Sequence, residues 1–171
     1  KGVKEIVATT AHAVLVPGAI DGWCKLLAER GTMKLAEVLA PAIAFAEEGF
    51  AITPRVALDW SRAEAKLRLH AGARKHLLPN GQPPNVGDVM RLPALANTLK
   101  VIAREGRDGF YRGPVAADMV ATLNAAGGLH TLEDFAAQSS TYVTPLATSY
   151  NGISLNELPP NNQGIVALIL L

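Results

Sequence analysis

Three consecutive side-chain amides, Asn161, Asn162 and Gln163, are the residues of this sequence best suited to hold a small substrate. They follow Pro159-Pro160, which stiffens the backbone, and precede Gly164, where the chain turns into an apolar helical pattern. Amides both donate and accept hydrogen bonds, and the first N–H groups of a helix are unpaired, so the segment suits a neutral acyl amide better than a phosphate. The alternative is that these side chains only cap the helix. Asn161, Asn162, Gln163 and Gly164 are therefore the predicted substrate-binding residues.

No metal or cofactor site is predicted from the other reactive residue types. His70 and His76 have no cysteine or carboxylate at ligand spacing, which is more typical of solvated histidines or of partners for a helix C-terminus than of a metal pair. Cys24 is the single cysteine, so it has no partner for an internal disulfide, and a packed thiol is the favoured interpretation. No residue is predicted to be catalytic.

The stretch from Val16 to Phe50 predicts two helices that organise the rest of the chain. The first covers 19–30 and stops at Gly31. The second is a core helix, kinked at Pro41, because its apolar residues recur at the spacing of one helix face, namely Leu35, Val38, Leu39, Ala42, Ile43, Ala46 and Phe50. The aromatic residues on or beside these faces are expected to share one core: Trp23, Phe45, Phe50 and Trp60.

The remaining chain is divided by recognisable start and turn signals. Thr53-Pro54 and Thr131 are typical helix starts, and Asn151-Gly152 is the strongest short signal for a β-hairpin. The predicted elements are a helix over 54–70, an irregular stretch over 72–93, helices over 93–104 and from 114, a short helix to about 137, strands over 142–149 and 153–158, and the start of a helix within 159–171. The predicted fold class is α+β, mainly helical, with a β-hairpin near residues 142–158.

Composition excludes several classes of partner. The 171 residues are 49% hydrophobic and 18% charged, with a net charge of +1, and no cluster of Lys and Arg stands out, so nucleic acid is not an expected partner. The longest apolar run, Ile165 to Leu171, is far shorter than the ~20 residues of a membrane-spanning helix, so no membrane segment is expected. The sequence starts without an initiator Met and stops within an apolar helical pattern that has no cap, so we expect an internal piece of a longer polypeptide. Its cellular compartment is not predicted.

Several motifs in order resemble the large subunit of the γ-glutamyltranspeptidase family of N-terminal-nucleophile hydrolases. The most specific are VPG-x-x-x-GW from Val16 and G-x-M-x-L-A-E-V-L-x-PAI-x-x-A-x-x-GF from Gly31. Further along stand G-x-x-G-F-Y-x-G from Gly106, GGL-x-T-x-x-D from Gly127 and LPP-x-x-x-G from Leu158. This chain departs from the family pattern at LPPNNQG, where many members have PPPSSGG. The sequence LPPNNQG is more similar to the acylase-like branch of the family.

The resemblance implies the helical part of an αββα hydrolase that cleaves itself and attacks a γ-glutamyl or related acyl amide through an N-terminal threonine. That threonine begins a small subunit outside this chain, so the implied partners are the small subunit, the remainder of the large subunit and a small acyl amide substrate. Thr9-Thr10 is not that nucleophile, because the chain continues into the large-subunit VPG motif. The arginine that grips the substrate carboxylate lies upstream of VPG, and Arg55, Arg62 and Arg74 do not replace it.

Two hypotheses about the whole chain remain. In the first, residues 1–171 are one segment of an incomplete domain, with a helical region over 16–137, a hairpin over 142–158 and the start of a truncated helix over 159–171. It serves as scaffold in a γ-glutamyltransferase or amidohydrolase and is inactive alone. In the second, the chain is a non-catalytic helical structural or binding module derived from that family. Detection of a second, threonine-led chain together with γ-glutamyl anilide hydrolysis separates them.

Overall fold

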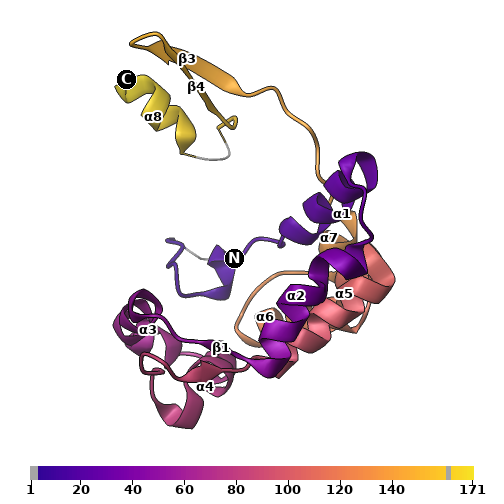
Figure 1. The fold of residues 1–171 in the computed structure, drawn as a ribbon, viewed down its shortest axis with the longest axis vertical. Coiled ribbons are helices and arrows are strands. Elements are labelled where there is room, and N and C mark those ends of the chain that lie inside the picture. Colours follow the sequence, from indigo (N-terminus) through magenta and orange to yellow (C-terminus); the bar gives the residue numbers. More distant parts are fainter. Residues whose placement is uncertain (1–3, 161–162) are drawn as a thin grey trace. The chain divides into compact units, whose positions relative to one another are not determined.

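The structure, a computed structural model, describes residues 4–160 and 163–171 and divides into two units, Lys1–Gln138 and Ser139–Leu171 (Figure 1). The larger unit holds η1 (Ala11–Ala13), α1 (Ala19–Arg30), α2 (Leu35–Glu48), β1 (Phe50–Ala51), α3 (Pro54–Leu67), α4 (Ala71–Leu77), η2 (Pro79–Gly81), β2 (Val89–Met90), α5 (Pro93–Tyr111), α6 (Pro114–Ala125) and α7 (Leu132–Ala137). The smaller unit holds β3 (Leu146–Tyr150), β4 (Ile153–Glu157) and α8 (Gly164–Leu170). The fold is a mainly helical α+β arrangement, as the sequence predicts.

Helix α5 is the centre of the larger unit. Helix α2 lies along it, and α1, α6 and α7 pack against it (Figure 1). The buried side chains between these helices form one apolar cluster of Ile20, Leu39, Leu99, Ile102, Phe110, Tyr111, Ala116, Val120 and Phe135. Because the burial of this apolar surface is the main favourable term in folding, α5 is the element on which the other helices depend.

The start signals act as predicted. Thr53 caps α3 by accepting a hydrogen bond from the Val56 amide. At α7 the Thr131 hydroxyl accepts the Asp134 amide at 3.1 Å, while the Asp134 carboxylate accepts the Thr131 amide at 2.9 Å. This reciprocal pair is a complete capping box, which the sequence indicates only weakly because Asp replaces the usual Glu.

The predicted aromatic core is wrong, because none of its four members belongs to the buried cluster. Phe45 is 62% exposed and Trp23 is 49% exposed, while Phe50 and Trp60 are half-buried outside the cluster. Helix α2 turns Leu39 and Ala46 inward. Phe45 precedes Ala46 by one position, which is about 100° around the helix, so its ring points away from α5. Helix α2 continues through Pro41 as one element.

One stretch differs from the prediction. The residues 72–93, expected to be irregular, contain most of α4, all of η2 and strand β2, which pairs antiparallel with β1 through Phe50 and Met90. The predicted end of the helix that begins at Pro93 agrees with the structure, because Gly106 is not helical and divides α5 into two helical pieces. Gly106 has a φ of +64°, a conformation that glycine adopts without penalty. The second piece, which the sequence did not predict, carries Arg107 and Tyr111.

The predicted hairpin is confirmed in the smaller unit, although its first strand begins at Leu146 and not at Tyr142. Strands β3 and β4 pair from Leu146 with Glu157 to Tyr150 with Ile153. The two turn residues, Asn151 and Gly152, have φ values of +49° and +78°, as a two-residue turn that matches the strand twist requires. Helix α8 packs on both strands. Among the described residues no helix combines the length and hydropathy that crossing a membrane requires.

Candidate functional site

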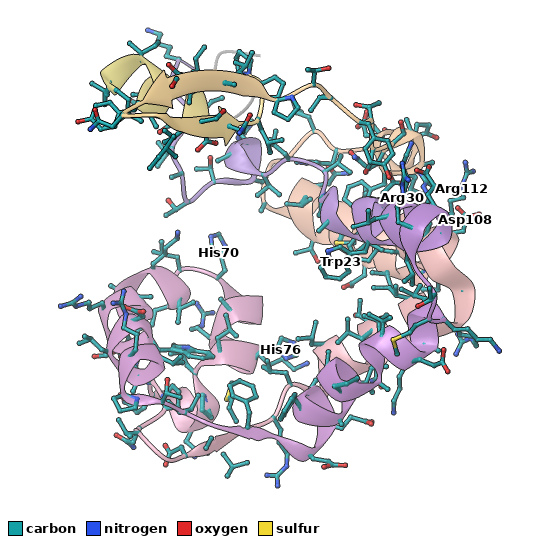
Figure 2. All side chains as sticks on the ribbon, turned by 45° about the horizontal axis from the view of Figure 1, so that its top comes forward. Trp23, Arg30, His70, His76, Asp108 and Arg112 are labelled. Carbon is teal, nitrogen blue, oxygen red and sulfur yellow. The ribbon has the colours of Figure 1, made fainter. Side chains whose placement is uncertain are left out.

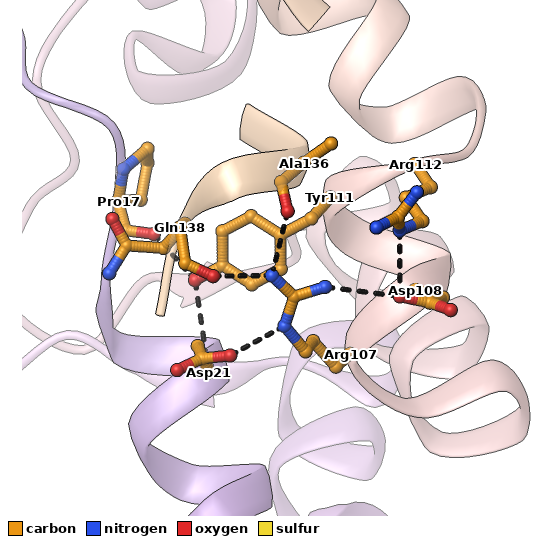
Figure 3. A network of polar contacts seen from close by, with 8 residues as sticks. All are labelled: Pro17, Asp21, Arg107, Asp108, Tyr111, Arg112, Ala136 and Gln138. Atoms are coloured by element: carbon orange, nitrogen blue, oxygen red, sulfur yellow. Dashed lines mark hydrogen bonds and ion pairs between the residues drawn. The ribbon is translucent and has the colours of Figure 1, made fainter. Parts of the chain in front are cut away.

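A buried polar network joins the start of α1 to the ends of α5 and α7 (Figure 3). Asp21, in the first turn of α1, is 6% exposed and accepts a hydrogen bond from Arg107 Nε at 2.5 Å. The Tyr111 hydroxyl donates to the Pro17 carbonyl at 2.6 Å and accepts the Asp21 amide at 3.2 Å. The carboxylate and amide of Asp21 and the Pro17 carbonyl are thereby paired, as buried polar groups generally are.

Arg107 extends the network to the end of α7. Its Nη2 donates to the Ala136 carbonyl at 3.1 Å and also to the Gln138 carbonyl. Its Nη1 contacts the Asp108 carboxylate at 3.1 Å, and its guanidinium carbon lies 4.9 Å from the centre of the Tyr111 ring. One side chain therefore uses its fork of donors and its flat face at the same time, which a lysine could not do.

The electrostatics of the network favour a structural role for its side chains over a catalytic one. The hydrogen bond that Arg107 donates to the Asp21 carboxylate is the main reason that the pKa of Arg107 is raised further above its ordinary value. Burial raises the pKa of the Tyr111 hydroxyl, partly offset by the hydrogen bond from the Asp21 amide. Burial also raises the pKa of the Cys24 thiol, and the charge of Asp21 adds to that effect. Tyr111 thus remains a donor to Pro17, and Cys24 remains a thiol rather than the reactive thiolate.

The predicted substrate-binding residues lie in the smaller unit. Asn161 and Asn162 are outside the described residues. Gln163 is exposed, and its side chain makes no capping hydrogen bond to α8. Gly164 packs so closely on β4 that a Cβ there would lie 2.3 Å from Glu157 Oε2 and 3.0 Å from Glu157 Cβ. A side chain at this position would have to displace the Glu157 side chain.

Among the other residues weighed as candidates, Arg62 and His76 are exposed, and four others have structural partners. His70 contacts the Thr9 carbonyl at 3.1 Å through Nε2, and the Thr10 hydroxyl donates to the Val7 carbonyl at 2.7 Å. Arg55 pairs with Asp59 at 2.6 Å, and Arg74 donates to the Arg68 carbonyl at 2.5 Å. Within the described part of the chain, His, Cys, Asp and Glu form no group of three that could hold a metal ion.

The hollow between α1 and the start of α2 is a different kind of surface. It has a volume of about 620 Å³, and Trp23, Leu26 and Val38 contribute exposed apolar side chains to it. Arg30 is the charged residue of its lining, and Figure 2 shows Trp23 and Arg30 on α1. Because a specific ligand site needs several convergent polar groups, this hollow does not match the acyl amide site expected from the sequence.

Sequence reasoning did not single out Asp21, Arg107 or Tyr111 as partners. The signal was nevertheless present, because Asp21 lies inside VPG-x-x-x-GW, and Arg107 and Tyr111 lie inside G-x-x-G-F-Y-x-G. The structure bonds these two motifs to each other across 86 to 94 residues of sequence. Spacing along the chain gives no indication of such a distant pairing.

Comparison with known proteins places this architecture in a family. A model of the gamma-glutamyltranspeptidase family matches residues 1–171. The acylase ACY 1 proenzyme of Pseudomonas sp. (strain V22) is 38% identical over 156 residues, which are 91% of this chain and 28% of that protein. The glutathione hydrolase proenzyme of Escherichia coli (strain K12) is 32% identical over 162 residues, 94% of this chain and 28% of that protein.

Solved structures agree with the sequence comparison. The gamma-glutamyltranspeptidase of Helicobacter pylori superposes with a TM-score of 0.86 at 31% identity, covering 93% of this chain and 46% of that chain. The cephalosporin acylase of Bacillus halodurans gives a TM-score of 0.83 at 38% identity, covering 90% of this chain and 30% of that chain. The chain therefore spans less than a third of the length of the two proenzymes compared above, and it belongs to the gamma-glutamyltranspeptidase family.

Proposed function

We propose that this chain is the helical part of the large subunit of an enzyme that hydrolyses or transfers a γ-glutamyl or related acyl amide. The observation that carries the proposal is the family match along all 171 residues, together with relatives that are named as acylase and glutathione hydrolase proenzymes. In this proposal the chain is an internal part of a larger domain. Its partners are the remainder of the large subunit and a threonine-bearing small subunit.

The chemistry in this proposal belongs to residues outside the chain. The N-terminal threonine of the small subunit attacks the acyl amide, and its own α-amine, with a pKa near ~8, serves as the base. The polar network around Asp21 and Arg107 supports the division of roles, because these two groups are paired with each other and burial keeps Tyr111 and Cys24 protonated. The chain alone should therefore show no hydrolysis.

We place the substrate contact of this chain at Asn161, Asn162, Gln163 and Gly164. Two features support the choice. The Gln163 side chain makes no capping bond to α8, so capping does not account for an amide at this position. Gly164 lets the segment lie directly against Glu157. Amide groups can pair with both the carbonyl and the N–H of an acyl amide.

The test uses the full proenzyme with two anilide substrates, γ-glutamyl anilide and glutaryl anilide, which differ by the α-amino group. We expect hydrolysis of at least one of them by the proenzyme and none by the 171-residue chain. Gln163→Ala should raise KM several-fold and leave self-cleavage unchanged, because it removes a binding group only. Gln82→Ala, the loss of an exposed amide in the larger unit, is the matched control and should change neither constant.

Two results would count against these proposals. Unchanged kinetics with lowered thermal stability in Gln163→Ala would assign the segment to structure alone. A correctly folded proenzyme that hydrolyses neither anilide would favour the second hypothesis, a structural or binding module without chemistry.

A further inference from the structure

We propose that Arg107 is a positioning residue which, with Asp21 and Tyr111, fixes the chain where it enters α1 and where it leaves α7. We call these three residues the Arg107 clamp. In the active enzyme the clamp would hold the segment after Gln138 in place for substrate binding. This last step rests on the function proposed above, whereas the clamp itself rests on contacts within the larger unit.

The entry side of the clamp is the turn before α1. The Tyr111 hydroxyl bridges two backbone groups of this turn, the Pro17 carbonyl at 2.6 Å and the Asp21 amide at 3.2 Å (Figure 3). Tyr111 is fully buried, with 0% exposure, so the bridge is shielded from competing water. The path of the backbone into α1 is thus tied to the last turn of α5.

The exit side of the clamp is the end of α7. Arg107 Nη2 donates to the carbonyls of Ala136 and Gln138, the last residues before the chain leaves for the smaller unit. The two sides also lie close together, because a Cβ added at Gly18 would lie 3.3 Å from Gln138 Nε2. Entry and exit therefore meet at one point, and the Asp21–Arg107 ion pair links them.

The properties of the ion pair make the three residues act as one unit. The side chain of Asp21 is 8% exposed and that of Arg107 is 27% exposed. Removing either partner leaves the other charge poorly solvated, which costs more than a surface pair does. Lysine in place of Arg107 would keep the charge beside Asp21 but would lack the fork that reaches both carbonyls. The exit contact is therefore the part that specifically needs arginine.

Loosening the exit should affect binding more than chemistry. The segment 139–171 carries Gln163 and Gly164 and is joined to the larger unit through Gln138. Added freedom at Gln138 spreads those residues over more positions, so fewer enzyme molecules hold the substrate correctly. The attacking group lies on another chain in this account, so KM should rise while kcat changes little.

The experiment combines kinetics with amide hydrogen exchange in the full proenzyme. Exchange at Asp21 reports on the entry, because its amide donates to Tyr111, and exchange at Gln138 reports on the exit, because its amide donates to the Phe135 carbonyl. Arg107→Gln should speed exchange at both sites roughly tenfold by loosening them locally. It should also raise KM roughly tenfold with kcat within about threefold of wild type.

Two further variants separate the two sides. Arg107→Lys should speed exchange at Gln138 and leave Asp21 near wild type, since the ion pair survives. Tyr111→Phe keeps the buried ring, so it should fold even where Arg107→Gln does not, and it should speed exchange at Asp21.

Arg112→Gln is the matched control, because Arg112 ends the same helix and pairs with Asp108 at 3.3 Å on the surface. It should change none of these values.

Defined results would overturn the clamp. Wild-type exchange at Asp21 and Gln138 in Arg107→Gln, or an equal effect of Arg112→Gln, would show that no clamp exists. If Arg107→Gln speeds exchange uniformly through α5 and α6, Arg107 contributes to general stability and not to a local clamp. If Arg107→Gln lowers kcat at constant KM, Arg107 does not position the substrate-binding segment. If the wild-type proenzyme hydrolyses no acyl anilide, the proposed function fails, while the exchange data still decide whether the clamp exists.

Discussion

Replacing Phe135 by alanine should be one of the most damaging core substitutions in the larger unit. Phe135 lies on α7, has 0% exposure and belongs to the cluster that α5 organises. A fully buried phenylalanine removes about 150–250 Å² from water, and at ~25 cal/mol per Å² the larger part of that stabilisation is lost with the ring. Allowing for partial collapse of the cavity, we expect a loss of about 3–5 kcal/mol in the free energy of unfolding.

Phe45→Ala is the matched control for the same chemical change. Phe45 is 62% exposed on α2, and alanine favours a helix more than phenylalanine does, so the loss should stay below about 1 kcal/mol. Pulse proteolysis of the proenzyme in increasing urea measures both values. A Phe135→Ala loss below about 1 kcal/mol would refute the assigned core. A Phe45→Ala loss as large as that of Phe135→Ala would show that the outer face of α2 is covered.

Four further substitutions test the cap of α7 and the contact between Gly164 and Glu157. Thr131→Ala removes the cap of α7 and should cost about 1 kcal/mol in urea unfolding at neutral pH. The Thr131 amide and hydroxyl hold the pKa of Asp134 below its usual value, so the stabilisation is present at neutral pH and is lost as the pH falls through the lowered pKa. Asp134→Asn should make the free energy of unfolding depend less on pH in the acid range, and an unchanged pH dependence would contradict the role assigned to Asp134. Gly164→Ala should lower the midpoint of thermal unfolding, because the added Cβ forces the Glu157 side chain aside. Adding Glu157→Ala to Gly164→Ala should restore part of that loss. No recovery in the double variant would show that the backbone, and not Glu157, excludes a side chain at position 164.

The sequence predicts best what neighbouring residues decide. Thr53-Pro54, Thr131 and Asn151-Gly152 work within a few residues of themselves, and each begins the helix or turn that it predicts. Strand β2 could not be predicted, because its two residues become a strand only by pairing with β1, about forty positions earlier. Phe45 shows a related limit, since several apolar residues share α2 and only the position of α5 decides which of them are buried.

The candidate site follows the same rule. The family motifs were readable in the sequence, but the hydrogen bonds between them were not, because Asp21 and Arg107 are 86 residues apart. Each of these residues alone reads as an ordinary surface charge on a helix. The helical turn after the break at Gly106, which the sequence did not predict, is the element that brings Arg107 and Tyr111 to α1. Recognition of the family needed only the order of the motifs, whereas the clamp needed their arrangement in space.

The most direct test of the account is the intact mass of the purified proenzyme, followed during activation alongside the rate of acyl anilide hydrolysis. We predict cleavage into two chains, the second beginning with threonine, with all 171 residues of this chain retained in the first. Activity should rise in proportion to cleavage. Hydrolysis by the 171-residue chain alone, or full activity in a proenzyme that stays uncleaved, would contradict the claim that this chain supplies scaffold and positioning while the nucleophile lies elsewhere.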